Sequence, residues 1–376
     1  IKNQKNNSMR LKSLFFIGLI ACSSCTSKKE VYNTTVAKDK RDFKPYITNG
    51  ILVGATLNHH ELNTDKEAKF LQNFKYLTPA NAAKQSRIHP KPNSWNWDEI
   101  DDFINFANTN NLVLRLHGPI SPQASKWAKT DKRTAQELEK NLIEFTTAFA
   151  KRFNNEPSVV WMDVVNETIL ANGEWFGPKP GTDQWENPWL KMGLDNNGYP
   201  LYILKAFEVA TQHATNIKLV YNQNSGLDDV LWGKLKETVL YLRSKGYRVD
   251  GIGWQAHLLL GAKREDFVEN TEQTMQKLAH LIDWAHNNDL AFHVTELDYL
   301  VKDNLKDQTE AELQIQKRVY KAITDVLIEK SKNGEVTLNL WDVGERYKKG
   351  TGMFHSIYDA KMNPTPAYEV IKSLLQ

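Results

Sequence analysis

Short apolar runs alternate with longer amphipathic stretches from about residue 45 to the end of the chain. The short runs are rich in β-branched residues, as buried strands are, and the longer stretches carry the periodicity of helices. The eight predicted strands are residues 51–58, 74–81, 111–118, 159–167, 217–224, 250–258, 291–298 and 336–343. Strands that alternate with helices predict an α/β fold with a parallel sheet and right-handed crossovers.

Eight strand–helix units predict a closed (β/α)8 TIM barrel that forms a single domain. The helical stretches include "WDEIDDFINFANTNN" (97–111) and "TAQELEKNLIEFTTAFAKRF" (134–153). The alternative is an open doubly wound sheet. It is less well supported, because no glycine-rich phosphate-binding turn follows the first strand, residues 51–58.

Charge and composition narrow the classes of partner. The 376-residue chain carries 48 Lys and Arg against 45 Asp and Glu, a formal net charge of +3. This near balance gives no electrostatic case for binding nucleic acid or an anionic membrane surface. A hydrophobic content of 41% suits one large core, and the chain is expected to act as a monomer.

The amino terminus has the features of an export signal, predicted over residues 1–21. Arg10 and Lys12 precede an apolar stretch, residues 14–21, that is too short to span a bilayer. Residues 1–8 precede Met9 and are interpreted as an upstream extension. The stretch "LIAC", which ends at Cys22, resembles a bacterial lipobox and implies lipidation of Cys22. The alternative is an ordinary secretory signal in which Cys22 is incidental.

The polar segment 22–43 is predicted to be a lipidated tether that precedes a catalytic barrel, residues 44–376. Such a protein would be exported and anchored by its lipid alone in the cell envelope, at the outer membrane or cell surface. Both cysteines, Cys22 and Cys25, lie in the amino-terminal part. We therefore expect no disulfide and no thiol chemistry in the barrel.

Polar and aromatic residues follow nearly every predicted strand. They are Asn58 to His60, Asn81, His117, Asn166, Glu167, Asn222 to Asn224, Gln255, His257, Glu296, Asp298 and Trp341. In a barrel of parallel strands these ends converge on one face, where such enzymes place their active sites. His59 and His60 could suggest a metal, but two adjacent histidines without further spaced ligands are weak evidence. We predict no metal and no cofactor.

Two strand-end carboxyl groups stand out, Glu167 on the fourth strand and Glu296 on the seventh. Simple strand alternation puts Glu167 on the face of Val165 and Glu296 on the face of Val294. The ends of these two strands lie across the barrel mouth from each other. A pair of carboxyl groups, one protonated and one ionised, is what glycoside hydrolysis requires. A single strand-end Glu would more often be a helix cap or a surface ion pair.

Five motifs that contain or flank these residues resemble those of glycoside hydrolase family 10, the family of many endo-β-1,4-xylanases. The motifs, in chain order, are "YLTPANAAK", "WMDVVNET", "DGIGWQAHL", "VTELDY" and "LNLWDVGERY". Each is weak alone, but they occur in the family's order across roughly residues 50–370. The resemblance therefore covers the whole predicted barrel.

The resemblance implies a retaining mechanism. Glu167 would act as general acid and then as general base, and Glu296 as the nucleophile. Asn166 would hydrogen-bond the 2-hydroxyl of the sugar attached to Glu296. His257 and Asp298 would form a pair that orients Glu296 and keeps it ionised.

The resemblance also implies substrate-binding residues. Contacts to sugar hydroxyls would come from Asn81, Lys84, His117 and Gln255, and an apolar face for the reacting ring from Trp341. Independently of the resemblance, Trp175 and the other aromatic residues of loop 175–189 lie on a long loop at the active face, where exposed aromatic side chains would stack on sugar rings. Alternatives stay open: Asn81 also fits a helix cap, Lys84 a solvated surface position, Trp341 a barrel-core position, and the loop aromatics a small satellite core.

The chain departs from the family pattern where sugar specificity is set. Ala80 replaces a glutamate, the stretch around Ser121 after the third strand has no Trp before Pro122, and Lys348 and Lys349 stand near a lost aromatic. These departures predict altered glycone subsites and poor cleavage of unsubstituted xylan. A substituted or algal glycan is the expected substrate. The lysines fit an acidic substituent such as a uronate or sulfate, and they fit surface solubility equally well.

The function predicted from the sequence is hydrolysis of a β-linked polysaccharide by a retaining, xylanase-like glycosidase. The alternative is a glycan-binding surface lipoprotein that keeps the fold without hydrolysis. The retention of both Glu167 and Glu296 argues against that alternative. A barrel enzyme that uses a metal or phosphate has no supporting motif.

Overall fold

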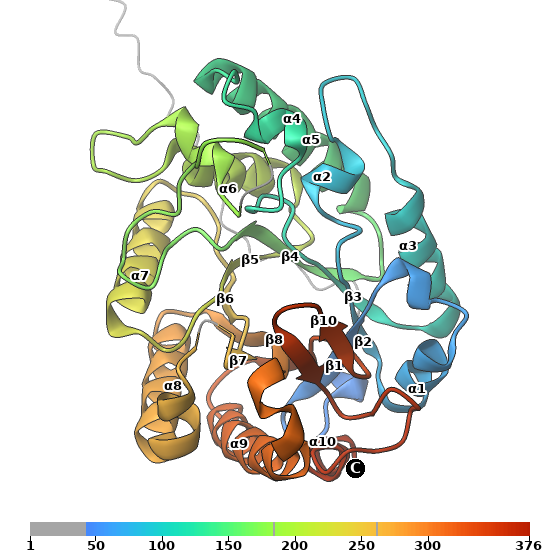
Figure 1. Cartoon of the computed structure of the whole chain (residues 1–376). Coiled ribbons are helices and arrows are strands. Elements are labelled where there is room, and N and C mark those ends of the chain that lie inside the picture. Colours follow the sequence, from blue (N-terminus) through green and yellow to red (C-terminus); the bar gives the residue numbers. More distant parts are fainter. Residues whose placement is uncertain (1–42, 183–184, 261) are drawn as a thin grey trace, which may run out of the picture. The chain divides into compact units, whose positions relative to one another are not determined.

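A computed structural model describes residues 43–182, 185–260 and 262–376, in which eight parallel strands close into a barrel surrounded by helices (Figure 1). The barrel order is β1–β2–β3–β4–β5–β6–β8–β9, and β9 pairs with β1 to close it. The strands are β1 (Leu52–Leu57), β2 (Tyr76–Pro79), β3 (Val113–Leu116), β4 (Val159–Asn166), β5 (Lys218–Gln223), β6 (Gly251–Trp254), β8 (Ala291–Lys302) and β9 (Val336–Leu340). The predicted TIM barrel and all eight strand positions are confirmed. The signal peptide, Cys22 and residues up to 42 of the tether lie outside the described residues.

Helices connect successive strands and begin at local sequence signals. The α-helices are α1 (Asp65–Asn73), α2 (Gln85–Ile88), α3 (Asp98–Asn110), α4 (Lys126–Lys129), α5 (Ala135–Phe153), α6 (Leu201–His213), α7 (Asp229–Ser244), α8 (Thr271–Asn287), α9 (Thr309–Lys330) and α10 (Tyr368–Leu375). Helix α5, for example, starts with a capping box in which Thr134 and Glu137 satisfy each other's backbone N–H groups. In the described part of the chain, no helix has both the length and the apolar character needed to cross a bilayer.

Short helical turns and strands complete the structure. The turns are η1 (Lys44–Tyr46), η2 (His59–Glu61), η3 (Pro188–Met192) and η5 (Asp303–Gln308), with one π-type turn, η4 (Glu265–Glu269). Three further strands, β7 (His257–Leu258), β10 (Arg346–Lys348) and β11 (Gly352–His355), extend the sheet above the barrel. Strand β11 pairs antiparallel with the carboxyl half of β8, which runs beyond the predicted strand to Lys302.

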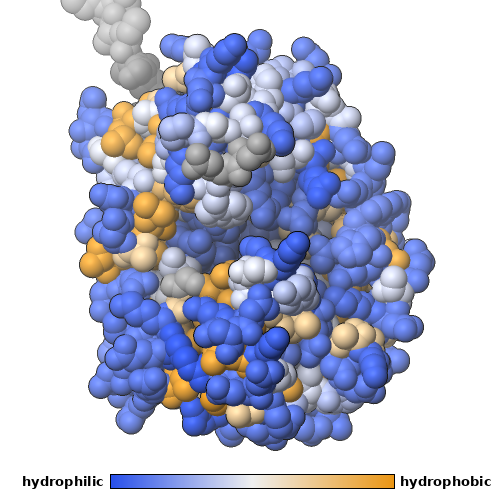
Figure 2. Space-filling model, viewed as in Figure 1, coloured by the Kyte–Doolittle hydropathy of each residue, from blue (hydrophilic) through white to orange (hydrophobic). Residues whose placement is uncertain are grey.

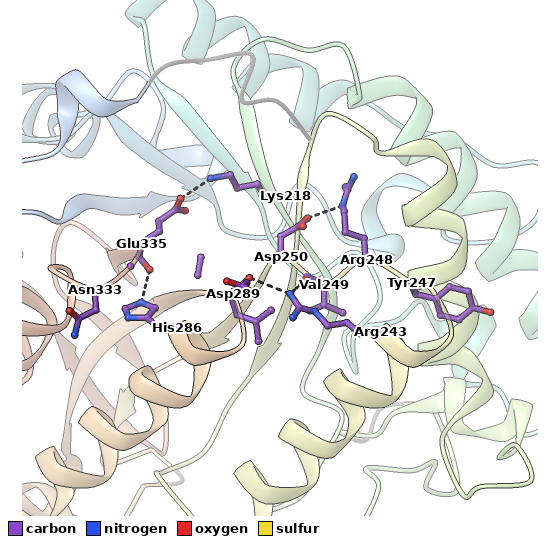
Figure 3. A pocket seen from close by; sticks show the side chains of 13 residues that line it. Lys218, Arg243, Tyr247, Arg248, Val249, Asp250, His286, Asp289, Asn333 and Glu335 are labelled. Atoms are coloured by element: carbon purple, nitrogen blue, oxygen red, sulfur yellow. Dashed lines mark hydrogen bonds and ion pairs between the residues drawn. The ribbon is translucent and has the colours of Figure 1, made fainter. Parts of the chain in front are cut away.

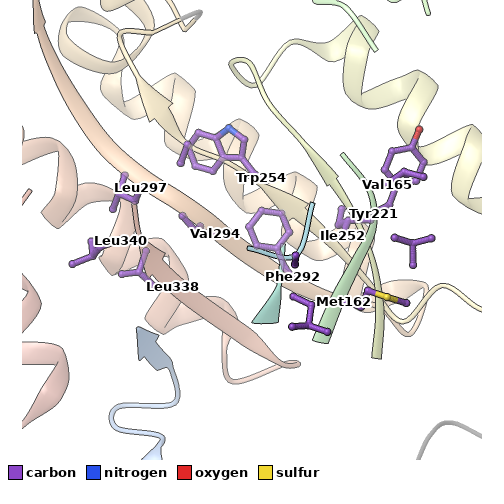
Figure 4. Close-up of a cluster of buried hydrophobic side chains, with 14 of the residues drawn as sticks. Met162, Val165, Tyr221, Ile252, Trp254, Phe292, Val294, Leu297, Leu338 and Leu340 are labelled. Atoms are coloured by element: carbon purple, nitrogen blue, oxygen red, sulfur yellow. The ribbon is translucent and has the colours of Figure 1, made fainter. Parts of the chain in front are cut away.

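The main apolar core joins the outer faces of the strands to the helices. Figure 4 shows part of this layer, with side chains from β4, β5, β6, β8 and β9 such as Met162, Ile252 and Phe292. Helix residues such as Phe149 and Phe207 belong to the same cluster. Strands that are buried on both faces appear in the sequence as continuous apolar runs, which is why their positions could be predicted.

The interior of the barrel is closed at its amino-terminal end by aromatic rings. Phe43 and Tyr76 pack on Trp161, with ring centroids 5.0 and 5.2 Å apart. Further along the interior, Arg115 donates from Nε to Asp163 at 2.8 Å, and both side chains are fully buried. A buried ion pair of this kind tolerates the loss of one partner poorly, since the remaining charge would be unpaired.

Both strands that carry the predicted catalytic carboxyl groups are bulged beside them. The register of β4 against β5 shifts between Asp163 and Val165, and that of β8 against β9 shifts between Val294 and Leu297. Val165 and Val294 therefore pack in the outer apolar core. The prediction that they share a face with Glu167 and Glu296 is wrong, because a bulge re-aims the following side chains.

The amino-terminal end of the barrel holds a cavity of about 610 Å³ (Figure 3). Its charged side chains are paired with one another: Lys218 with Glu335 at 2.7 Å, and Arg248 with Asp250 at 2.9 Å. Arg243 donates to the backbone carbonyls of Asn288, Val249 and Asp289. These pairs hold the loops at this end, which in TIM barrels is the face that contributes stability.

Candidate active site

A cleft of about 460 Å³ lies at the carboxyl-terminal ends of the strands. Figure 2 shows a hollow in the middle of this face, lined mainly by hydrophilic residues. The lining residues are Lys84, His117, Gln123, Glu167, Trp185, Asn224, Ser225, Gln255, His257, Leu260, Glu296, Trp341, Arg346, Lys348 and Phe354. Both predicted carboxyl groups therefore face one cleft.

The backbone turns sharply where several strands enter this cleft. Glu167 has φ +56°, and Ala256, between Gln255 and His257, has φ +59°. Asp342, the residue after Trp341, has φ +140°. Non-glycine residues adopt such conformations at a cost of order 1–3 kcal/mol, so they persist only where the surroundings hold them. Glu167 itself lines the cleft, and so do Gln255 and His257 beside Ala256 and Trp341 beside Asp342.

A chain of hydrogen bonds connects the two carboxyl groups. Gln255 Nε2 donates to Glu167 Oε1 at 2.9 Å and to Asn166 Oδ1 at 3.0 Å. Asn222 Nδ2 donates to the same Asn166 oxygen at 3.0 Å and to Glu296 Oε1 at 3.0 Å. The side chains come from β4, β5, β8 and the end of β6, so the barrel itself fixes the relative positions of the carboxyl groups.

Histidines hold the Glu296 carboxyl in its ionised form. His257 Nε2 lies 3.1 Å from Oε2, and His117 Nδ1 lies 3.5 Å from Oε1. Burial alone would raise the pKa of Glu296, but the charge of His117, together with the hydrogen bond and charge of His257, lowers it to about 2. Glu296 is therefore a buried carboxylate at neutral pH.

His257 is in turn oriented by Asp298. Its Nδ1 lies 2.9 Å from Asp298 Oδ1, so the ring bridges two carboxyl groups. Burial lowers the pKa of His257, but the charges and hydrogen bonds of Asp298 and Glu296 outweigh it and raise that pKa to about 10. A cationic imidazole can donate from both nitrogens, which this geometry requires.

Glu167 has the opposite environment. Its burial raises the pKa of the carboxyl group above the ordinary value of 4.5, and the charge of Glu296 adds to the increase. The hydrogen bond from Gln255 and the charge of Lys84 act in the other direction without reversing it. The cleft thus holds one carboxyl group that favours its proton and one that releases it, a division of the kind found in glycosidases.

Four of the predicted substrate-binding residues line the cleft, and two do not. Lys84, His117, Gln255 and Trp341 line it, and Trp341 presents its ring edge-on to His117, with centroids 5.1 Å apart. Asn81 does not line the cleft; its backbone carbonyl accepts the N–H of Lys84.

Trp175 lies away from the cleft lining and secures the loop after β4. Its indole N–H donates to the carbonyl of Gly198 at 3.0 Å, and the ammonium of Lys234 lies 4.1 Å from its ring. This position matches the alternative of a satellite core. Of the loop aromatics, Trp185 lines the cleft instead, with 46% of its surface exposed.

The sequence analysis assigned no role to three residues of the site: Asn222, Gln123 and Arg346. Asn222, which bonds Glu296, was visible as a polar strand end but had no motif to distinguish it. Gln123 lines the cleft and accepts a hydrogen bond from the ammonium of Lys84. Arg346 lines the cleft from strand β10. Lys348, which the sequence indicated together with Lys349, also lines it, whereas Lys349 does not.

His59 lies outside the cleft lining and within 2.8 Å of Asp102. Across the described ranges, no group of three or more His, Cys, Asp and Glu side chains could hold a metal ion.

Comparison with known proteins gives one consistent family. The family model described as Glycosyl hydrolase family 10 matches residues 44–374. An endo-1,4-beta-xylanase A from Caldicellulosiruptor saccharolyticus is 27% identical over 374 residues, which cover 94% of this chain and 99% of that enzyme. A second endo-1,4-beta-xylanase A, from Thermoanaerobacterium saccharolyticum, is 26% identical, but the match covers 87% of this chain and only 27% of that longer protein.

A solved structure has the same fold. The crystal structure of xylanase 10B from Thermotoga petrophila in complex with xylobiose superposes with a TM-score of 0.70 at 23% identity, covering 87% of this chain and 94% of that one. Because the family model spans nearly the whole described chain, with the two carboxyl groups in one cleft of a TIM barrel, the protein belongs to glycosyl hydrolase family 10.

Proposed function

We propose that the protein is a retaining glycoside hydrolase that cleaves a β-1,4-linked, xylan-like polysaccharide, with Glu167 and Glu296 as its catalytic residues. One observation carries the proposal: two carboxyl groups share a cleft and a hydrogen-bond chain, and their pKa values move in opposite directions. Retaining enzymes need this division, since one group must donate a proton while the other attacks.

In the first step, Glu167 protonates the glycosidic oxygen as the bond to the anomeric carbon breaks. Glu296 attacks that carbon from the opposite side and forms a covalent glycosyl-enzyme. In the second step, ionised Glu167 takes a proton from water as the water attacks the anomeric carbon, which releases Glu296. The two carboxyl groups of retaining enzymes stand about 5–5.5 Å apart, and we expect this spacing here.

The surrounding groups hold Glu296 ready for attack. His257 and Asn222 each donate to one of its oxygens, so the carboxylate is both oriented and kept ionised. Asp298 fixes the ring of His257. Asn166 accepts two hydrogen bonds at its amide oxygen and donates one N–H to Glu167 Oε1 at 3.2 Å. Its second N–H is left to hydrogen-bond the 2-hydroxyl of the reacting sugar.

The substrate assignment rests on the family and on the relatives, which are named as xylanases. The glycone subsites are altered in this chain. Ala80 supplies a buried methyl group where the family pattern has a glutamate, and the carbonyl of Ser121 accepts the indole N–H of Trp189 at 3.2 Å. A lost polar contact in a sugar site costs about 1–3 kcal/mol.

We therefore expect unsubstituted β-1,4-xylan to be cleaved at least tenfold less efficiently than a substituted xylan or algal β-glycan. A panel of soluble plant and algal polysaccharides, followed by sizing of the products, measures this directly. If plain xylan is the best substrate in the panel, the altered-subsite part of the proposal is wrong. If no β-glycan is cleaved, the hydrolase proposal itself fails.

The pH dependence of kcat/KM should follow the two carboxyl groups. Activity requires protonated Glu167, so kcat/KM should fall as pH rises through the raised pKa of that group, which gives the alkaline limb of the profile. Activity also requires ionised Glu296, so the acidic limb should lie near the pKa of that group, about 2. Gln255→Leu removes a hydrogen bond that favours ionised Glu167. The alkaline limb should therefore move to higher pH, and kcat/KM at the optimum should fall about tenfold.

A matched control for this variant is Gln316→Leu. It removes another buried amide, one that donates to the backbone carbonyls of His355 and Ser356 and not to a carboxyl group. The alkaline limb of the Gln316→Leu pH profile should lie where that of the wild type does. A Gln255→Leu profile with an unmoved or lowered alkaline limb would contradict the assignment of Glu167 as the acid.

We also propose that the protein is exported and anchored through a lipid on Cys22. The support is the sequence alone, since Cys22 lies outside the described residues. Expressed in a bacterium, the protein should partition with membranes, and Cys22→Ala should release it or stop its processing. Mass spectrometry that finds an unmodified mature amino terminus would refute the anchor.

A further inference from the structure

Two cationic side chains that have no role in the hydrolytic steps line the cleft. Arg346 and Lys348 stand two residues apart on β10, so they lie on the same face of the strand, about 7 Å apart along the backbone. Tyr347, between them, lines a separate cavity with Val301 and Met353. The hairpin β10–β11 thus directs both cations, and not the aromatic ring, toward Glu167 and Glu296.

The hairpin is a firmly held part of the structure. Strand β11 pairs with β8 at Tyr299 to Lys302, immediately after Asp298. Phe354 of β11 lies under the Arg346 guanidinium, with the cation 4.2 Å from the ring centroid. The base of the hairpin is fixed by a contact of 2.8 Å between Glu345 Oε1 and His355 Nδ1. Side chains on such a support can form a binding site of fixed geometry.

The hydrogen-bond donors of both side chains remain available. Arg346 has one ion-pair contact, to Asp298 Oδ2 at 3.5 Å, which is long for a hydrogen bond. Lys348 is exposed. Neither side chain donates a hydrogen bond to any of the residues that the structure describes. Arg346 and Lys348 therefore line the cleft with hydrogen-bond donors whose capacity is little used.

A neutral sugar chain gives no reason for this excess of positive charge. The cations that line the cleft are Lys84, Arg346, Lys348 and His257, whereas its carboxyl groups are ionised Glu296 and Glu167, which favours its proton. The buried Asp298 contacts His257 and Arg346 and offsets part of this charge. Like charges concentrated in a cleft repel one another and favour anions in it. The cations would gain most from a substrate that brings its own negative charge.

We propose that Arg346 and Lys348 bind an anionic substituent, a carboxylate or a sulfate ester, carried by a sugar of the chain in the cleft. The inference rests on the proposed glycosidase function and names its substrate more closely. The planar fork of Arg346 suits an oxyanion, and Lys348 adds a point charge from the same strand face. The sequence pointed to Lys348 and Lys349 for this role; the geometry replaces Lys349 with Arg346.

The test compares four oligosaccharides on one β-1,4-xylosyl backbone: unsubstituted, uronic-acid-substituted, substituted with the methyl ester of that uronic acid, and sulfated. The methyl ester has nearly the size of the acid but no charge. For the purified full chain, kcat/KM for the acid or the sulfate should exceed that for the ester about tenfold. Comparison of kcat/KM for the two charged substrates distinguishes a uronate site from a sulfate site. Raising the ionic strength should reduce the preference.

Single substitutions test which side chains cause the preference for the charged substrate. Lys348→Gln and Arg346→Gln should each reduce the ratio of kcat/KM for the charged substrate to that for the ester about threefold, and the double variant should abolish the preference. Lys349→Gln removes the same charge one residue further on, outside the cleft lining, and should leave the ratio and the basal activity unchanged. Lys348 is exposed, so its variant should fold even if the Arg346 variant does not.

Equal cleavage of the acid, the sulfate and the ester would overturn the proposal, and so would a ratio that falls as much in Lys349→Gln as in Lys348→Gln. If none of the four substrates is cleaved, the xylosyl backbone assumed in the proposed function is wrong. Calorimetry with the intact acidic oligosaccharide then tests the anion site by itself. Binding weakened about threefold by Lys348→Gln would support the site, and unchanged binding would reject it.

Discussion

Glu296→Gln should reduce kcat/KM by about 10⁴-fold or more on every substrate that the protein cleaves. The amide has the shape of the carboxylate but cannot form the glycosyl-enzyme. It also removes the negative charge that His257 and Asn222 are arranged to hold. Steady-state kinetics on an aryl glycoside and on a polysaccharide measure the loss, which should be similar on both because the leaving group does not alter the need for a nucleophile.

Glu335→Gln is the matched control for Glu296→Gln. Glu335 lies at the opposite end of the barrel, where it accepts from Lys218 at 2.7 Å and from the indole of Trp161 at 3.1 Å. This variant should keep its activity while its melting temperature falls. A Glu296→Gln protein that melts as the wild type does but still turns over would remove Glu296 from the mechanism. A wild-type protein that binds β-glycans without cleaving any would favour the glycan-binding alternative.

Glu167→Ala should have an effect that depends on the leaving group. On natural glycosides, whose leaving oxygen needs a proton, kcat/KM should fall by about 10²–10⁴-fold. With an activated aryl leaving group, the first step needs no proton and should be nearly unaffected. The second step then lacks its base, so the glycosyl-enzyme should accumulate and produce a burst of released phenol.

Adding azide to the reaction gives a second test of Glu167→Ala. As a small anion that needs no general base, it should enter the space left by the Glu167 carboxyl and attack the glycosyl-enzyme. Turnover of the aryl glycoside should rise with azide concentration, and the product should be a glycosyl azide of retained configuration. Equal losses on good and poor leaving groups, with no azide product, would reject Glu167 as the acid/base.

The positions of the strands could be predicted from the sequence because each buried strand is marked by its own run of apolar residues. The run of residues 159–166 is buried throughout and apolar except for Asp163 and Asn166, since the parallel strand is covered on both sides. The bulges at Asp163–Val165 and Val294–Leu297 could not be predicted, since alternation alone carries no sign of an extra residue. Strand β10 was missed for a related reason: Arg346 to Lys348 is short and charged, and it becomes a strand only because β11 pairs with the extended β8.

For the site, the sequence indicated which residues reach the cleft but not how they contact one another. Glu167, His257 and Glu296 could be selected because polar strand ends converge on one face of a barrel. The link through Asn222 depends on β5 lying between β4 and β6, and no local motif records that. Trp175 was predicted to reach the cleft because it lies on the loop after β4. Its indole N–H instead donates to the Gly198 carbonyl, which turns the ring toward the protein.

The central claim is that Glu296 becomes covalently attached to the sugar. A 2-fluoro xylobioside with a good leaving group tests it, because the fluorine slows both steps and the leaving group restores the first, so the intermediate accumulates. Intact mass followed by peptide sequencing should find one added glycosyl group, on Glu296. A label on any other residue, or the absence of a label from a protein that hydrolyses the parent aryl glycoside, would contradict the account.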